Sequence, residues 1–141
     1  MHCSPTAYRV LYVEDNPADA QLLDFILKNR DEPVELTMLE NGEAALEFIN
    51  SKPFRPDVIA LDLNLPRIDG LTVLAALKSD PSLKSIPVLV FVAPNTLQAK
   101  RAFELKADLC LAKPFDLEEY RQLGDVIREL GRPRSESVAA G

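Results

Sequence analysis

Residues Pro56 to Gly70 read Pro-Asp-Val-Ile-Ala-Leu-Asp-Leu-Asn-Leu-Pro-Arg-Ile-Asp-Gly. The apolar run Val58 to Leu61 has the pattern of a strand that is buried on both faces of a parallel sheet. It ends in Asp62, and the proline and glycine that follow predict a compact loop before the next helix. Open α/β sheets bind ligands at the carboxyl ends of their strands, so Asp62 is a candidate site residue. An aspartate that only ends a strand and caps a turn would give the same pattern.

Apolar runs and helix-like patterns alternate along the whole chain. We expect strands over residues 9–13, 33–39, 58–61, 87–92 and 108–112. We expect helices that begin near residues 17, 42, 71, 95 and 116, and Pro94-Asn95 opens the fourth of these helices. Asn16 before Pro17 is a typical helix start, and Asp116 with Glu119 has the spacing of a capping box. Strands that alternate with helices form right-handed βαβ units. The sequence therefore predicts an α/β fold, a doubly wound, five-stranded parallel sheet with helices on both faces.

The length of 141 residues suits one domain with its own core. We expect that domain over residues 8–130, with an N-terminal extension over 1–7 and a flexible tail over 131–141. No apolar run reaches the length of a membrane span, and the first residues lack the features of a signal peptide, so we expect a cytoplasmic protein. The net charge of −6 argues against nucleic acid as a direct partner, because phosphate binding needs a basic surface.

Charged side chains follow three of the predicted strands. Glu14 and Asp15 come after the first, Asp62 after the third and Lys113 after the fifth. Taken singly, the acids could favour the positive end of a helix and the lysine could be solvated. Together they would share one edge of a parallel sheet, where crowded carboxylates are unfavourable without a cation. Mg²⁺ suits such a site, because it accepts few carboxylates and keeps several waters.

Three groups of residues match one known family. They are Val13-Glu14-Asp15-Asn16, Asp62 with Leu65-Pro66 and Asp69-Gly70, and Lys113-Pro114-Phe115. Over about residues 8–130 the chain resembles the receiver domains of two-component response regulators. Segments 14–19 and 79–81 are similar to the stand-alone regulators that partner bacterial phytochrome kinases. The resemblance implies a flavodoxin-like (βα)5 fold with strand order 2-1-3-4-5.

The resemblance also implies a phosphoacceptor site. Asp62 would take a phosphoryl group from a phosphohistidine of a sensor histidine kinase, which the similarity to phytochrome-associated regulators implies to be of the phytochrome type. Mg²⁺ would be held by Asp15, Asp62 and the backbone carbonyl of Asn64, with Glu14 acting through water. We therefore expect a signalling module that acts by protein contact, without an output domain and without turnover as an enzyme.

Lys113 is implied to pair with a phosphoryl oxygen. In the family the peptide bond before the following proline is usually cis, so we expect a cis bond before Pro114.

Two positions depart from the family pattern. Receivers normally place threonine or serine at the end of the fourth strand, where this chain has Val92, and Thr96 is the nearest hydroxyl. They commonly place tyrosine or phenylalanine three residues before the lysine, where this chain has Cys110. Because valine cannot donate a hydrogen bond, we expect Asp62 to be phosphorylated but the signal to spread weakly or by another route. The alternative is a pseudo-receiver, a scaffold that binds partners without a phosphorylation-driven switch.

Cys110 itself has two interpretations. A place within a short apolar strand favours an inert, small hydrophobic residue, and the alternative is a redox-sensing thiol. With Cys3 it forms no disulfide framework and has no metal-ligand spacing.

Two further expectations concern partners and activity. The family often dimerises through its fourth helix, fifth strand and fifth helix, a face for which we expect the exposed residues Leu97, Arg101, Glu104, Glu118, Arg121 and Gln122. A hydrolase that forms an aspartyl phosphate is an alternative from another class. Such enzymes usually carry the nucleophile after their first strand with a second acid two residues on, whereas here Asp62 and Asn64 follow the third strand.

Overall fold

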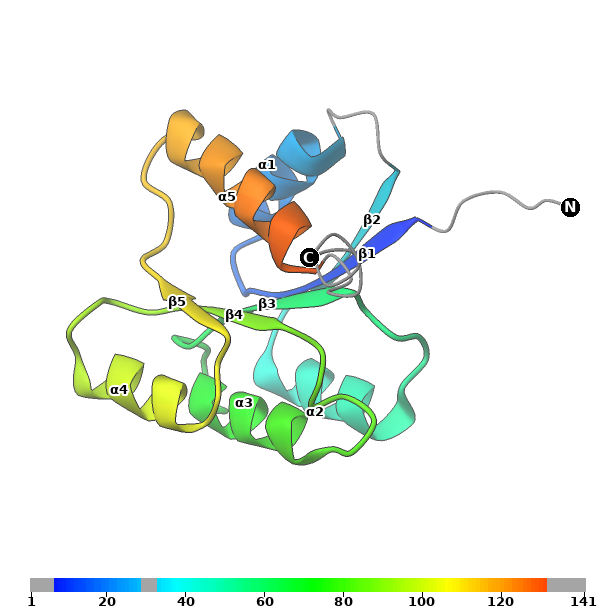
Figure 1. The fold of residues 1–141 in the computed structure, drawn as a ribbon, viewed down its shortest axis with the longest axis vertical. Coiled ribbons are helices and arrows are strands. Elements are labelled where there is room, and N and C mark those ends of the chain that lie inside the picture. Colours follow the sequence, from blue (N-terminus) through cyan, green and yellow to red (C-terminus); the bar gives the residue numbers. More distant parts are fainter. Residues whose placement is uncertain (1–6, 29–32, 132–141) are drawn as a thin grey trace, which may run out of the picture.

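The computed structural model describes residues 7–28 and 33–131, which form a parallel sheet between two layers of helices (Figure 1). The strands are β1 (Tyr8–Val13), β2 (Val34–Leu39), β3 (Val58–Asp62), β4 (Val88–Phe91) and β5 (Leu109–Leu111), in the order β2-β1-β3-β4-β5. The helices are α1 (Pro17–Lys28), α2 (Gly42–Ser51), α3 (Gly70–Ser79), α4 (Leu97–Glu104) and α5 (Leu117–Leu130). Figure 1 shows α1 and α5 on one face of the sheet and α2, α3 and α4 on the other. The predicted doubly wound sheet and its flavodoxin-like strand order are confirmed.

Nearly all of the expected N-terminal extension (1–7) and flexible tail (131–141) lies outside the described residues. Among the residues that are described, no helix combines the length and the apolar character that crossing a membrane would require.

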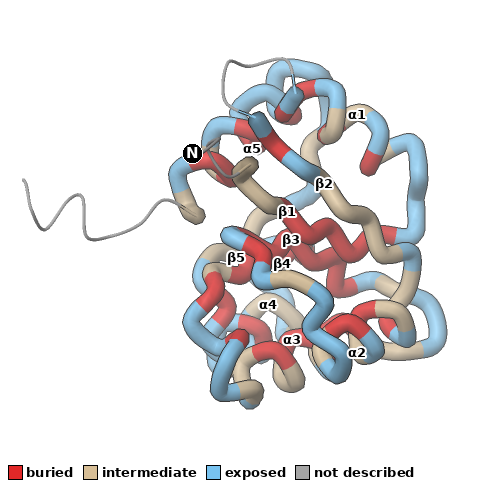
Figure 2. Tube along the Cα trace, turned by 90° about the vertical axis from the view of Figure 1, so that its right-hand side faces the viewer, coloured by how far each residue is buried: buried red, intermediate tan, exposed pale blue. Residues whose placement is uncertain are grey.

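The core has two halves, one on each face of the sheet. Alternate residues of β1 belong to different halves: Val10 and Tyr12 pack with α1 and α5, whereas Leu11 and Val13 pack with α2 and α3. Every residue of β3 is buried, and the central strands form the buried band of Figure 2. This explains why β3 shows no polar alternation. Its only charged residue, Asp62, stands at the carboxyl end.

Local capping sets where the helices begin. Asn16 accepts a hydrogen bond from the Ala18 backbone N–H at 3.0 Å, as its position before α1 predicts. At α5, Asp116 accepts from the Glu119 N–H at 2.9 Å, and the Glu119 carboxylate accepts from the Phe115 N–H at 2.6 Å. The capping pair is therefore confirmed, although Glu119 reaches one residue further back than in the usual box.

The predicted start of α4 at Pro94-Asn95 is wrong. Thr96 is the N-cap, and its hydroxyl accepts a hydrogen bond from the Ala99 N–H at 3.1 Å. Asn95 cannot continue into a right-handed helix from its own conformation, because its φ is 61°. The helix consequently begins at Leu97, two residues after Asn95.

Gly70 allows α3 to begin directly against the end of β3 and the loop that follows Asp62. Its N–H donates to the Leu63 carbonyl oxygen at 3.3 Å. A Cβ at this position would lie 2.5 Å from the Leu63 Cα and 3.0 Å from the Asp62 carbonyl oxygen. Both contacts are with backbone, so an added methyl group could be accommodated only by moving the loop.

We expect Gly70→Ala to lower the free energy of unfolding by about 1–3 kcal/mol, because it overpacks this contact. Urea unfolding followed by circular dichroism measures the change. Thr72→Ala is the matched control on the same helix, since Thr72 is exposed, and it should change stability by less than about 0.5 kcal/mol. Equal stability of the two variants would contradict the close approach at Gly70.

Candidate functional site

The carboxyl ends of β1 and β3 bring three carboxylates together. Glu14 and Asp15 directly follow β1, and Asp62 is the last residue of β3. One carboxylate oxygen from each of the three lies within 4.8 Å of the others. Glu14 is completely buried and Asp62 is 5% exposed, whereas Asp15 faces solvent. The structure therefore assembles the predicted acidic cluster at one edge of the sheet.

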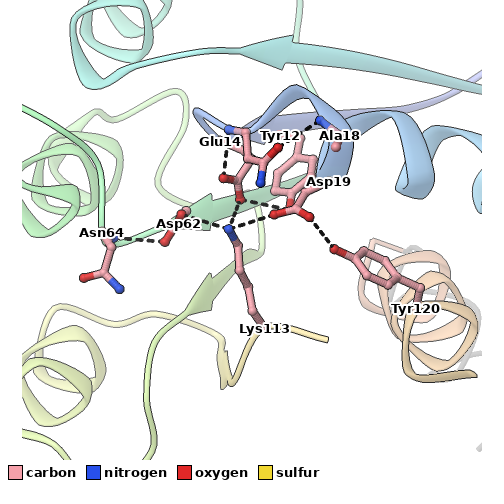
Figure 3. A network of polar contacts seen from close by, with 9 residues as sticks. Tyr12, Glu14, Ala18, Asp19, Asp62, Asn64, Lys113 and Tyr120 are labelled. Atoms are coloured by element: carbon pink, nitrogen blue, oxygen red, sulfur yellow. Dashed lines mark hydrogen bonds and ion pairs between the residues drawn. The ribbon is translucent and has the colours of Figure 1, made fainter. Parts of the chain in front are cut away.

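Lys113 provides the positive charge of this cluster (Figure 3). Its Nζ lies 2.7 Å from Glu14 Oε1, 3.0 Å from Asp19 Oδ2 and 3.3 Å from Asp62 Oδ2. Burial alone would lower the pKa of Lys113, but its hydrogen bonds to Glu14 and Asp19 and the charge of Asp62 outweigh burial and raise that pKa. The side chain is therefore an ammonium group at neutral pH.

The expectation of a cis bond before Pro114 is wrong, since the described residues contain no cis peptide bond. The bond from Lys113 to Pro114 is trans. The long lysine side chain nevertheless reaches the carboxylates of Glu14, Asp19 and Asp62, because the loop after β5 runs along the same sheet edge.

Glu14 is held by two hydrogen-bond donors besides Lys113. The Tyr12 hydroxyl donates to Oε1 at 3.2 Å, and the Asn16 backbone N–H donates to Oε2 at 3.1 Å. Burial raises the pKa of Glu14, Lys113 opposes this rise, and the charge of Asp62 adds to it. The carboxyl group therefore takes up a proton at a higher pH than an ordinary glutamate. Burial and the adjacent Glu14 charge also raise the pKa of Tyr12, so its hydroxyl stays a donor.

Asp62 lies at a cleft of about 260 Å³. Its Oδ1 accepts a hydrogen bond from the Asn64 N–H at 2.9 Å, while Oδ2 faces Lys113. The cleft is lined by Asp62, Asn64, Phe91, Val92, Ala93, Pro94, Ala112 and Lys113. The carboxylate thus has a charged neighbour on one side and a largely apolar wall on the other.

None of the residues that line this cleft carries a hydroxyl group. Val92 occupies the position after β4 where the family places a hydroxyl, and it is 4% exposed. The Thr96 hydroxyl is engaged elsewhere, because it donates to the Ala93 carbonyl oxygen at 2.8 Å and caps α4. The described part of the chain therefore offers no substitute for the missing hydroxyl within the cleft.

Cys110 is half-buried and packs against the half of the core that α2, α3 and α4 cover. Burial raises the pKa of its thiol, which disfavours the thiolate that reacts with oxidants. These observations support the interpretation of a small hydrophobic residue. Cys3 lies outside the described residues.

The donor set fits a hard divalent cation. Glu14, Asp15 and Asp62 offer only oxygen atoms, and their mutual repulsion would be relieved by two positive charges. The backbone carbonyl of Asn64 stays a predicted ligand.

The sequence interpretation missed Asp19 and Tyr120 as parts of this network. The Tyr120 hydroxyl donates to Asp19 Oδ1 at 3.0 Å, and the other oxygen of Asp19 contacts Lys113. Asp19 lies in the first turn of α1, where an acidic residue is expected for the helix dipole alone. Tyr120 matches the apolar stripe of α5. One signal was available, because a buried tyrosine hydroxyl usually requires a hydrogen-bond partner.

We expect Lys113→Gln to raise the pKa of Glu14 further, because the ammonium group is the main influence that holds this pKa down. Carbon-13 NMR titration of the glutamate carboxyl groups in metal-free buffer measures it. Lys78→Gln is the control, since the Lys78 ammonium pairs with Asp108 at 2.8 Å, away from the cluster. If Glu14 titrates at the same pH in both variants, Lys113 does not set its charge state.

Comparison with known proteins identifies the family. Residues 10–124 match the response regulator receiver domain. The response regulator Rcp1 of Synechocystis sp. is 38% identical over 116 residues, which cover 78% of this chain and 79% of Rcp1. The DNA-binding dual master transcriptional regulator RpaA of Synechocystis sp. is 37% identical over 114 residues, but the match spans only 45% of RpaA.

Solved structures agree with this result. The phosphorylated cyanobacterial phytochrome response regulator RcpA superposes with a TM-score of 0.80 at 35% identity, covering 88% of this chain and 93% of RcpA. The Mn²⁺-bound form of Rcp1 gives a TM-score of 0.76 at 34% identity and covers 86% and 92% of the two chains. With its acidic cluster and lysine at the expected strand ends, the chain belongs to the response regulator receiver domains of two-component systems.

Proposed function

We propose that this receiver takes a phosphoryl group from a phosphohistidine of a sensor histidine kinase onto Asp62. The placement of Asp62 carries the proposal, since its carboxylate lies in an open cleft beside Lys113 and the other acids. A carboxylate oxygen attacks phosphorus, the bond from phosphorus to the histidine nitrogen breaks, and that nitrogen keeps the electron pair. The product is an aspartyl phosphate, so the protein acts as a phosphoacceptor and not as an enzyme with turnover.

We propose Mg²⁺ as the metal, held by Asp15, Asp62 and the Asn64 backbone carbonyl, with Glu14 acting through water. When bound, the ion neutralises charge on the phosphoryl oxygens. The oxygen-only donor set supports this assignment, as does the existence of a Mn²⁺-bound form of the relative Rcp1. Glu14 contributes negative charge from a buried position, where its hydrogen bonds with Tyr12 and Asn16 fix its orientation.

Lys113 has the role of binding a phosphoryl oxygen. Its ammonium group already lies 3.3 Å from the Asp62 oxygen that faces it. The Lys113 side chain is 35% exposed, so the ammonium group can turn toward the open side of the cleft. A mobile point charge suits an oxygen whose position shifts during transfer.

The partners follow from the family and from the exposed surface. We propose a sensor histidine kinase as the phosphoryl donor, of the phytochrome type because RcpA is a phytochrome response regulator. Signalling by protein contact is supported by the face of α4, β5 and α5, on which the residues expected to be exposed are exposed: Leu97, Arg101, Glu104, Glu118, Arg121 and Gln122. A homodimer through this face, the lack of an output domain, a cytoplasmic location and the absence of nucleic acid as a partner stay predictions.

A second candidate is the pseudo-receiver scaffold. The apolar wall at Val92 and the replacement of the aromatic residue by Cys110 favour it, because both parts of the usual switch are missing. The intact cluster of Glu14, Asp62 and Lys113 favours phosphorylation.

With Mg²⁺ and acetyl phosphate, we expect the protein to gain one phosphoryl group, which intact-mass spectrometry detects. Asp62→Asn should abolish the adduct, and so should replacing Mg²⁺ by a chelator, because the crowded carboxylates then repel the donor. Asp57→Asn is the matched control at the opposite end of β3, where Asp57 accepts a hydrogen bond from the Arg9 N–H at 2.8 Å. It should be labelled like the wild type.

Other outcomes of this experiment separate the alternatives. No adduct from acetyl phosphate or from a histidine kinase would favour the scaffold. Continuous release of phosphate without a stable adduct would favour a hydrolase.

Val92→Thr should enlarge the conformational response to phosphorylation, because the new hydroxyl can donate to a phosphoryl oxygen, a gain of about 1–3 kcal/mol. NMR chemical-shift changes over residues 97–111, with and without acetyl phosphate, measure the response. Val92→Ala is the control, since it changes the packing at this position without adding a donor. Equal responses in the two variants would count against the missing hydroxyl as the cause of a weak switch.

A further inference from the structure

Three carboxylates already share the Lys113 ammonium group. An ammonium group has three donors, and here three carboxylates surround it, those of Glu14, Asp19 and Asp62. A phosphoryl oxygen that binds Lys113 therefore competes with these carboxylates for the ammonium group.

Asp19 is the partner that can be displaced at the lowest cost. Its side chain is 24% exposed, whereas those of Glu14 and Asp62 are 0% and 7% exposed. A carboxylate that can reach water loses less when it gives up a cation than a buried one does. Asp19 also lies outside the trio that fits a divalent cation.

Asp19 connects the site to α5. While one of its oxygens contacts Lys113, the other accepts from the Tyr120 hydroxyl at 3.0 Å (Figure 3). Tyr120 is 5% exposed and lies in the first turns of α5. Burial and the hydrogen bond with Asp19 raise the pKa of Tyr120 to about 12, so the hydroxyl keeps its proton and remains a donor. The chain of contacts runs from the cleft through α1 to α5.

We propose that Asp19 and Tyr120 are positioning residues that report the state of Lys113 to α5, a route that does not need a hydroxyl at Val92 or an aromatic ring at Cys110. This inference rests on the proposed phosphoacceptor function. When Lys113 turns to a phosphoryl oxygen, Asp19 loses its cation and becomes a stronger acceptor for Tyr120. The first turns of α5 are then held more tightly against α1.

Hydrogen–deuterium exchange measured by mass spectrometry on the full chain tests this link. The probe is Mg²⁺ with beryllium fluoride, a mimic of a phosphoryl group bound to an aspartate. We expect the probe to slow exchange of residues 117–124 in the wild type. In Tyr120→Phe, which keeps the ring and removes the hydroxyl, this slowing should be smaller by about twofold to tenfold, as expected for one hydrogen bond. Asp19→Asn should reduce it as well.

The matched control is Tyr8→Phe. The Tyr8 hydroxyl donates to the Ile127 carbonyl oxygen at 2.6 Å, so it binds the opposite end of the same helix, away from the site. If Tyr120 had a purely structural role, Tyr120→Phe would change the exchange rate equally with and without the probe. Only the proposed link changes the amount by which the probe slows exchange.

Each result decides the matter. A probe-induced slowing that is kept in Tyr8→Phe but reduced in Tyr120→Phe supports the link. The same slowing in the wild type, Tyr8→Phe and Tyr120→Phe overturns the link and leaves the phosphoacceptor function standing. So does the absence of slowing in a wild type that binds the probe. A wild type that binds no probe, shown by the absence of a fluorine NMR signal of the bound species, overturns both.

Discussion

The site depends on one electrostatic compensation, the Lys113 ammonium group among carboxylates that the fold has buried. Glu14 is fully buried and Asp62 nearly so, and a buried charge deprived of its partner costs about 3–5 kcal/mol. The cost here is smaller than that limit, because part of Lys113 reaches solvent. The sheet can still end in paired acids only because the loop after β5 returns a cation to the same edge. The three distant segments meet there because the carboxyl ends of parallel strands share one edge of the sheet.

The elements that the sequence predicted are those with strong local signals. The unbroken apolar run of β3 and the acid that ends it were sufficient to place Asp62 at the sheet edge, since burial on both faces leaves few other arrangements. Glu14 and Lys113 followed from the same rule of parallel strand ends. The start of α4 was not predictable to the residue, because the conformation of Asn95 depends on the loop around it.

Asp19 and Tyr120 show what such reasoning leaves out. Each has an ordinary local explanation, one as an acid in a first helical turn and the other as a member of an apolar stripe. Their contact joins residues separated by 101 positions. It depends on how closely α1 and α5 approach, and a Cβ on Gly124 would lie only 2.9 Å from Ile26 Cγ2. No periodicity in the sequence records that distance.

Two tyrosine hydroxyls join α5 to its neighbours near opposite ends of the helix, Tyr120 to Asp19 of α1 and Tyr8 of β1 to Ile127. Tyr8 fastens the C-terminal end at Ile127, inside the molecule and remote from the cleft. The helix has 14 residues and is about 21 Å long, so a small rotation about its C-terminal end would displace its N-terminal end the most. The residues of α5 that lie farthest along the helix from Ile127 are Leu117 and Glu118. On the proposed link, a change at Asp19 would therefore displace the exposed start of α5 more than the end that Tyr8 holds.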